Sequence, residues 1–160
     1  MNDKKLVTIL TDEKMGQIVA RIAHEILEKQ QTVGDFILVG IYTRGVYLAQ
    51  RLAQAIQKIT NIEVPLGRLD ITFYRDDIAG MPGHPVVKST DIPFDINEKE
   101  IIIIDDVLFT GRTIRAAMDA LMDYGRPRRI MLAVLIDRGH RELPIRADIV
   151  GKNLPTMRGE

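Results

Sequence analysis

Two adjacent carboxylates, Asp105 and Asp106, stand between a run of four isoleucines and a hydroxyl-rich turn. The isoleucines, residues 101–104, are β-branched and leave no polar face, which predicts a central parallel strand covered by helices on both sides. From Arg112 the apolar residues follow a helical spacing, so the turn lies at a helix N-terminus. This pattern places two acidic side chains and several free backbone N–H groups at one point of the chain.

The turn and the acidic pair suit different parts of one ligand. Free N–H groups and the positive end of the helix dipole favour a phosphate monoester, and the hydroxyls of Thr110 and Thr113 add donors. Asp105 and Asp106 would repel a phosphate, but as acceptors they suit ribose hydroxyls or a hydrated divalent cation. The sequence therefore predicts that a sugar, a phosphate and a metal ion bind together here.

A simpler interpretation is that the acidic pair only ends a strand and that the threonines only cap a helix. Against it, the carboxyl end of a buried strand is where open α/β sheets bind their ligands. The stretch has neither the G-x-x-x-x-G-K pattern of P-loop NTPases nor the G-x-G-x-x-G pattern of dinucleotide-binding proteins.

A second candidate anion loop lies earlier in the chain. Residues 36–41 form another apolar run, predicted to be a buried strand, and Thr43, Arg44 and Gly45 follow it before a helical pattern. Threonine supplies a hydroxyl, arginine a planar fork for phosphate oxygens, and glycine lets the backbone approach closely. Taken alone, the same three residues would suit an ordinary strand-to-helix turn.

The remaining pattern predicts alternating helices and strands. A helix is expected after a cap at Thr11 or Asp12, and strands are expected over 69–74 and 129–136. Residues 75–93 are expected to be irregular, as a mobile hood over the ligand or as a disordered segment. The alternation predicts an α/β fold with a parallel sheet, covered on both faces and joined by right-handed crossovers.

The composition fits one globular domain over residues 1–160, because 46% of the 160 residues are hydrophobic and 28% are charged. There is no cysteine, which excludes disulfides and thiolate chemistry and suits a reducing cytoplasm. The sequence has no signal-peptide pattern and no apolar stretch of membrane-spanning length, so a soluble cytoplasmic protein is expected. Residues 126–160 hold eight Lys or Arg against four Asp or Glu, which suits a polyanion-binding face or, more simply, a solvated surface.

The string over residues 101–113 resembles the motif with which type I phosphoribosyltransferases bind phosphoribosyl pyrophosphate (PRPP). Together with residues 37–49, 70–77 and 132–148 it resembles one family within that class more closely. This family is the bacterial pyrimidine operon attenuation regulators, which also have uracil phosphoribosyltransferase activity. The similarity runs from the first helix to residues 152–156, which is nearly the whole chain.

The resemblance implies a type I phosphoribosyltransferase fold, with a central parallel sheet, flanking helices and a flexible hood over about residues 68–93. It implies that uracil and PRPP react to give UMP and pyrophosphate, with Mg²⁺ bound through PRPP and water near Asp105 and Asp106. The PRPP- and UMP-binding positions implied by the motif are Thr43, Arg44, Gly45, Asp105, Asp106, Val107, Leu108, Phe109, Thr110, Gly111, Arg112 and Thr113.

Each part of that set has an implied role. Asp105 and Asp106 would hold the ribose hydroxyls, residues 110–113 the 5′-phosphate, and residues 43–45 the pyrophosphate, with Arg44 stabilising its departure. Arg75, Asp76 and Asp77 would begin the hood, and Ile136, Asp137 and Arg138 would meet the base.

The same family binds a hairpin in the leader messenger RNA of pyrimidine genes, which gives a second hypothesis of another class: an RNA-binding regulator that senses UMP or PRPP. Its basic surface would be formed by Arg21, His24, Arg141, Arg146 and Lys152. No RNP-type aromatic pattern is present, so recognition of an RNA loop would depend on polar contacts and on stacking by arginine. We also expect a homo-oligomer of two or more copies.

A rival assignment is a purine or orotate phosphoribosyltransferase without RNA binding, because the PRPP motif is shared across the class. Purine enzymes usually place an aromatic residue and a lysine near the base, and residues 126–151 contain no Phe, Tyr, Trp or Lys. The family pattern usually continues for about one strand and a tail beyond residues 152–156, whereas this chain stops at Glu160. That C-terminal strand is therefore expected to be missing, and the hood is expected to be short.

Overall fold

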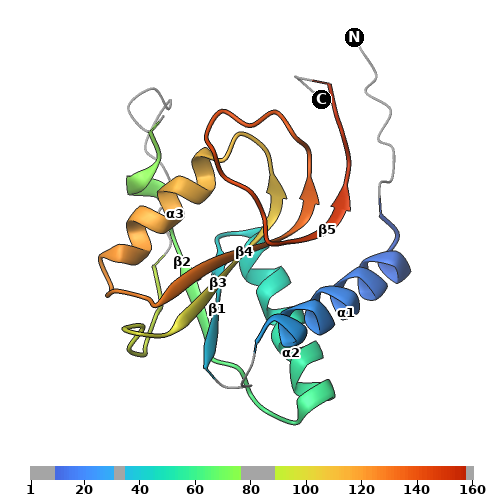
Figure 1. Ribbon diagram of the computed structural model, residues 1–160, viewed down its shortest axis with the longest axis horizontal. Coiled ribbons are helices and arrows are strands. Elements are labelled where there is room, and N and C mark those ends of the chain that lie inside the picture. The colour runs from blue at the N-terminus through green and yellow to red at the C-terminus, as the bar shows by residue number, and fades with distance from the viewer. Residues whose placement is uncertain (1–9, 31–34, 77–88, 158–160) are drawn as a thin grey trace.

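A five-stranded parallel sheet forms the centre of the protein in a computed structural model that describes residues 10–30, 35–76 and 89–157 (Figure 1). The strand order is β2-β1-β3-β4-β5, and all four neighbouring pairs are parallel. The strands are β1 Phe36–Ile41, β2 Leu66–Leu69, β3 Glu100–Leu108, β4 Arg129–Asp137 and β5 Ile149–Asn153. The helices are α1 Asp12–Lys29, α2 Arg44–Thr60 and α3 Arg112–Met122, with a short 3₁₀ helix, η1, at Thr72–Tyr74.

The four isoleucines of β3 divide between two hydrophobic cores. Ile102 and Ile104 pack with α1 and α2 on one face of the sheet, and Ile101 and Ile103 pack with α3 on the other (Figure 1). All four side chains are fully buried. Successive side chains of a strand point to opposite faces, so an unbroken apolar run is stable only where both faces are covered. The predicted central strand and the α/β fold are confirmed.

The helices leave the sheet in opposite directions at the point where the ligand site was predicted. β1 leads into α2 on one face, while its neighbour β3 leads into α3 on the other. The chain therefore diverges at the carboxyl ends of two adjacent strands, which opens a crevice at this edge of the sheet.

Two strand expectations differ from the structure. The strand predicted over 69–74 is wrong: β2 ends at Leu69, because the Asp70 carboxylate accepts hydrogen bonds from the Thr72 amide and hydroxyl, at 2.8 and 2.5 Å, and turns the chain into η1. β5 was not predicted. It is an edge strand that pairs only with β4 and holds a single fully buried apolar residue, Ile149, so its sequence lacks an apolar run.

The other predicted elements have their expected places. Thr11 caps α1, since its hydroxyl accepts a hydrogen bond from the Lys14 amide at 3.2 Å. Residues 77–88, which include Asp77 and the middle of the predicted hood, lie outside the described residues. After them Asp91 forms an antiparallel bridge to Arg68 of β2. Within the described chain, no helix has the length and apolarity needed to cross a membrane.

Substitution of two glycines by alanine should change stability in opposite directions. A Cβ on Gly45 would lie 2.5 Å from the Ile104 carbonyl oxygen, a backbone atom that cannot rotate away, so Gly45→Ala should destabilise the protein by about 1–3 kcal/mol. Gly16 lies inside α1 with its nearest neighbour 4.0 Å from such a Cβ, so Gly16→Ala should stabilise the protein by about 0.5–1 kcal/mol. Urea unfolding of both variants tests this, and shifts of the same sign would contradict it.

Candidate active site

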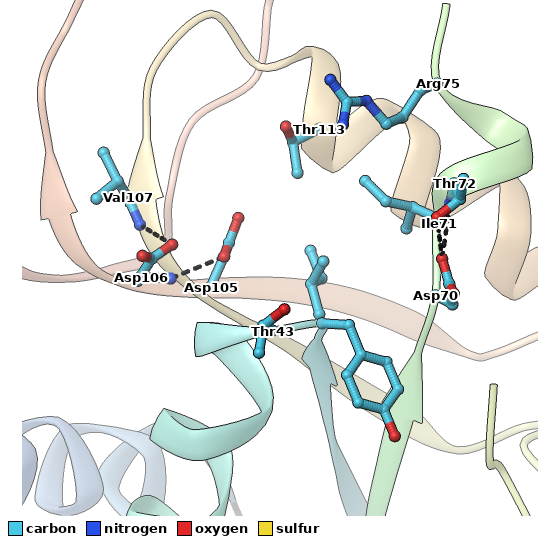
Figure 2. Close-up of a pocket in the computed structure, with 11 residues that line it drawn as sticks. Thr43, Asp70, Ile71, Thr72, Arg75, Asp105, Asp106, Val107 and Thr113 are labelled. Atoms are coloured by element: carbon cyan, nitrogen blue, oxygen red, sulfur yellow. Dashed lines mark hydrogen bonds between the residues drawn. The ribbon is translucent and has the colours of Figure 1, made fainter. Parts of the chain in front are cut away.

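A cleft of about 350 Å³ opens at the carboxyl edge of the sheet (Figure 2). Figure 2 shows Asp105 and Asp106 on one side of it, Asp70 and Thr72 on the opposite side, and Arg75 near Thr113. The lining residues come from the ends of β1, β2 and β3, from η1 and the residue after it, and from the start of α3: Ile41, Tyr42, Thr43, Asp70, Ile71, Thr72, Arg75, Asp105, Asp106, Val107 and Thr113.

Asp105 is a buried carboxyl group, with only 7% of the residue exposed. Its Oδ1 accepts a hydrogen bond from the Asp106 amide at 2.8 Å. Burial raises the pKa of Asp105 to about 8, and the hydrogen bond and negative charge of the Asp106 side chain add to this rise. In the free protein the Asp105 carboxyl is therefore mostly protonated at neutral pH.

Asp106 is half-buried and accepts a hydrogen bond from the Val107 amide at 2.9 Å. Each acidic side chain is thus fixed by the amide of the next residue, near the carboxyl end of the central strand β3. Fixed carboxyl oxygens at this position can accept hydrogen bonds from vicinal hydroxyls of a sugar. The described residues contain no group of three or more His, Cys, Asp or Glu side chains that could hold a metal ion alone.

The predicted phosphate turn leads from β3 into α3. Gly111 has φ = 94°, a left-handed conformation that favours glycine, and it precedes Arg112, the first residue of α3. The Thr110 hydroxyl accepts from the Arg112 amide at 3.2 Å, and Thr113 lines the cleft. The structure therefore places a helix N-terminus and a hydroxyl beside the acidic pair, as the sequence predicted.

The three residues of the second anion loop have different surroundings. Thr43 lines the cleft with Asp105 and Asp106. Arg44 instead lines a neighbouring apolar pocket of about 410 Å³, which Asp106 also reaches. Gly45 is buried against the end of β3 and allows α2 to approach it. The structure brings Thr43 to the acidic pair but does not place the Arg44 side chain in the same cleft.

The predicted base segment is divided between two further pockets. Ile136 lines the 410 Å³ pocket, whereas Asp137 and Arg138 line a pocket of about 260 Å³. The Arg138 guanidinium lies over the Phe109 ring, 4.2 Å from its centroid, and its Nε donates to the Thr156 hydroxyl at 3.1 Å. An aromatic residue therefore does lie against this segment, supplied by the phosphate turn, and the argument from the aromatic-free stretch 126–151 overlooked it.

The start of the predicted hood touches both the cleft and the phosphate turn. Arg75 lines the cleft. Asp76 pairs with the Arg112 guanidinium at 2.6 Å, and Arg112 also pairs with Glu142 at 2.9 Å. The Arg112 side chain thus joins two flanking segments and does not line the cleft.

The five residues of the predicted RNA surface do not all lie together. Arg21 on α1 donates to Glu25 at 2.7 Å and to the backbone of β5 at Gly151, which brings it close to the strand that contains Lys152. His24 lines a groove between α1 and α2 that also contains Arg51 and Lys58.

Arg146 is exposed in the loop before β5. Arg141, in contrast, is half-buried against the base segment and the phosphate turn.

Sequence reasoning missed Asp70 and Thr72, which form the wall of the cleft opposite Asp105 (Figure 2). Asp70 directly follows β2, and so repeats the signal of an acidic residue at the carboxyl end of a strand. The signal was hidden because the strand had been predicted over 69–74, which put Asp70 in its interior.

Comparison with known proteins matches residues 7–157 to the family model described as phosphoribosyl transferase domain. The chain is 60% identical over 157 residues to the bifunctional protein PyrR of Caldicellulosiruptor bescii, covering 98% of this chain and 86% of that protein. It is 56% identical over 160 residues to the bifunctional protein PyrR of Enterococcus faecalis, covering 100% of this chain and 88% of that protein.

Solved structures show the same fold. A hypoxanthine phosphoribosyltransferase from Staphylococcus aureus matches 95% of this chain and 80% of its own, with a TM-score of 0.73 and 21% identity. A hypoxanthine-guanine phosphoribosyltransferase from Bacillus anthracis matches 93% of this chain and 84% of its own, with a TM-score of 0.74 and 18% identity. The chain therefore has the type I phosphoribosyltransferase fold.

Replacing Asp105 with Asn should flatten the pH dependence of the free energy of unfolding. The folded carboxyl keeps its proton up to about pH 8, whereas the unfolded one loses it near its ordinary pKa of 3.8. Between these limits the folded state binds more protons, so the free energy of unfolding of the wild-type protein falls as pH rises, by up to about 1.4 kcal/mol per pH unit. Asn has no such proton, so the variant should be the more stable protein at pH 7, with the two converging near pH 4.

Urea unfolding between pH 4 and pH 8 measures this difference. The control is the same type of substitution at an exposed residue of α3, Asp119→Asn, which should keep the wild-type pH dependence. Parallel curves for the wild-type and Asp105→Asn proteins would show that burial does not raise the pKa of Asp105.

Proposed function

Because the chain belongs to the phosphoribosyl transferase domain family, we propose that it transfers the ribosyl 5-phosphate group of PRPP to N1 of uracil, giving UMP and pyrophosphate. One observation carries the proposal: a single cleft combines two fixed acidic side chains, a helix N-terminus with a threonine hydroxyl, and the Thr43 loop. These groups match the ribose, the 5′-phosphate and the pyrophosphate of PRPP. The similarity to proteins named PyrR supports the pyrimidine assignment.

In the proposed reaction no side chain acts as a nucleophile. Asp105 and Asp106 hold the ribose hydroxyls, and the turn at 110–113 holds the 5′-phosphate, so the sugar is fixed at both ends while the bond from C1 to pyrophosphate breaks. Positive charge develops on the sugar, and the acidic pair beside it stabilises that charge. N1 of uracil bonds to C1 as the bond to pyrophosphate breaks, and the N1 proton passes to the departing pyrophosphate or to water. Thr43 and the α2 N-terminus receive the departing pyrophosphate. Arg44, the predicted partner of pyrophosphate, would join them only by turning out of the neighbouring 410 Å³ pocket.

The carboxyl groups of the cleft fit a hydrated Mg²⁺ ion, which prefers one or two carboxylates together with water and substrate phosphates to an all-protein cage. Asp105 and Asp106 are the residues that would hold it, through PRPP oxygens and water. When bound, Mg²⁺ supplies charge neutralisation of the pyrophosphate leaving group.

A purine or orotate acceptor is the rival for the same cleft. The motif for PRPP does not distinguish the bases, and Phe109 beside Arg138 supplies an aromatic ring that a purine enzyme would also use. Incubation with PRPP, Mg²⁺ and each of uracil, hypoxanthine, guanine and orotate decides the base: we expect consumption of PRPP with uracil only.

We also propose that the protein binds leader messenger RNA of pyrimidine genes and so regulates their transcription by attenuation, as the PyrR resemblance implies. The specific observation in favour is that the Arg21 side chain reaches the backbone of β5, which brings a cation of α1 to the strand that contains Lys152. Arg146, exposed in the preceding loop, extends this basic stretch along the chain. A homo-oligomer of two or more copies stays a prediction, which light scattering of the purified protein would test.

Changing Asp105 and Asp106 together to Asn should lower the rate of UMP synthesis by about 10²-fold or more, because the variant loses the charge that stabilises the transition state. Asp106→Asn also alters the acceptor of the Val107 amide, so urea unfolding of the double variant at pH 7 is measured beside the rate to separate lost activity from unfolding. The measurement is uracil-dependent PRPP consumption, with Asp119→Asn as the control. A double variant with the wild-type rate would remove the acidic pair from the mechanism.

Changing Arg146 and Lys152 together to Gln should weaken binding of leader RNA and reduce the log–log salt slope of the affinity by up to about two units, if both contact phosphates. UMP synthesis should be unchanged. Gel shifts at several salt concentrations measure the effect. The control, Arg126→Gln with Arg128→Gln, removes two positive charges at the opposite end of β4. Equal losses in both double variants would indicate a general effect of net charge rather than a basic surface at β5.

A further inference from the structure

Arg141 connects the two parts of the protein that would bind opposite ends of the nucleotide. Its Nη1 donates to the carbonyl oxygen of Phe109, in the phosphate turn, at 2.8 Å, and its Nη2 donates to Asp137 Oδ2, in the base segment, at 2.5 Å. Its Nε donates to the Ile145 carbonyl oxygen at 2.8 Å, and its Nη1 also reaches the Gly139 carbonyl oxygen at 3.4 Å. One guanidinium therefore ties the turn after β3 to the loop after β4.

The phosphate turn is held by its carbonyl groups. Those of Leu108 and Thr110 accept from backbone amides of the loop 138–143, each at 2.9 Å, and that of Phe109 accepts from Arg141. In a trans peptide the C=O and N–H groups point in opposite directions. Three consecutive carbonyls bound from one side therefore leave the N–H groups of the turn facing the other side. Successive N–H groups that face one way form an anion-binding concavity.

The Arg141–Asp137 ion pair in this link is partly buried. The side chains of Arg141 and Asp137 are 23% and 16% exposed. Burial of Asp137 acts to raise its pKa, but the hydrogen bond from Arg141, the Gly139 amide and the charge of Arg141 together lower the pKa of Asp137 below its ordinary value. The carboxylate is thus charged at neutral pH, and the ion pair persists over the working range.

We infer that Arg141 is a positioning residue for the 5′-phosphate subsite, one that aims the N–H groups of the phosphate turn by holding the Phe109 carbonyl and the base segment together. The inference rests on the proposed function. It gives Arg141 a role inside the protein in addition to the RNA contact that the resemblance implies, since its guanidinium makes four hydrogen bonds to the protein.

The test compares UMP, which would occupy the 5′-phosphate subsite, with pyrophosphate, which would occupy another part of the same site. Arg141→Gln should weaken the binding of UMP, measured by calorimetry, by at least about tenfold, because the turn loses a charged donor. It should leave the binding of pyrophosphate with Mg²⁺, which the Thr43 loop receives, within about twofold of wild type. The KM for PRPP should rise more than kcat falls. Arg128→Gln, which breaks an ion pair with Glu100 at the far end of the sheet, should change neither affinity.

Each other outcome overturns the inference. Equal loss of UMP and pyrophosphate binding would show a general structural role, and unchanged UMP binding with weakened RNA binding would show a surface contact. If Arg141→Gln fails to fold by circular dichroism, Arg141→Lys provides the test, because it keeps the charge but cannot bridge two acceptors in a fork; full UMP affinity in that variant would overturn the inference. Wild-type protein that binds neither ligand would overturn the proposed function itself, and the inference with it.

Discussion

Burial of one carboxyl group beside another, at the end of a strand that is apolar on both faces, is the constraint on which the rest of the structure depends. Asp105 is placed there by the four buried isoleucines before it, which fix β3 in the centre of the sheet. Burial disfavours the ionised form of Asp105, and the hydrogen bond and charge of Asp106 add to this effect, so the pKa of Asp105 is raised. Ionisation of the buried Asp105 carboxyl is therefore unfavourable in the free protein, and a ligand with hydroxyl donors or positive charge can offset this penalty. The buried carboxyl thus lowers the free energy of unfolding at neutral pH, and in return it provides affinity for such a ligand.

The surroundings of the acidic pair follow from that position. A site at the ends of β1 and β3 needs the chain to leave in opposite directions, and Gly45 allows this because α2 can begin almost in contact with the Ile104 carbonyl. On the other side, Gly111 takes a left-handed conformation so that α3 can begin directly above the cleft. The two helix N-termini thus lie on either side of the carboxylates, where the two phosphate-bearing ends of a PRPP molecule would lie.

The sequence permits prediction of those parts of the site that are continuous in the chain. The apolar runs of β1 and β3, the acidic pair and the start of α3 have patterns that local sterics and burial impose, and each was predicted from its own residues. The parts that were missed depend on contacts between distant segments. Asp70 enters the cleft only because β2 ends earlier than its alternation suggests, and Phe109 meets Arg138 only because β4 lies beside β3. No periodicity in one segment encodes such pairings.

The excess of positive charge after residue 125 is another feature whose meaning depends on contacts between distant segments. Counted along the chain, residues 126–160 hold eight basic residues against four acidic ones, which suggests a surface for a polyanion. In space this charge is dispersed: Arg128 and Arg129 both pair with Glu100 at the amino end of the sheet, at 3.5 and 3.2 Å. Arg138 and Arg141 are engaged by the phosphate turn and its neighbours.

The cations that remain for a polyanion lie around β5, and α1 adds Arg21 to them from the other end of the sequence. A basic surface in this protein must therefore be assembled from two distant segments. Its boundary with the catalytic cleft follows the exposure of the arginine side chains, since that of Arg21 is 47% exposed although it pairs with Glu25, whereas that of Arg141 is 23% exposed. Net charge along the chain does not reveal this boundary.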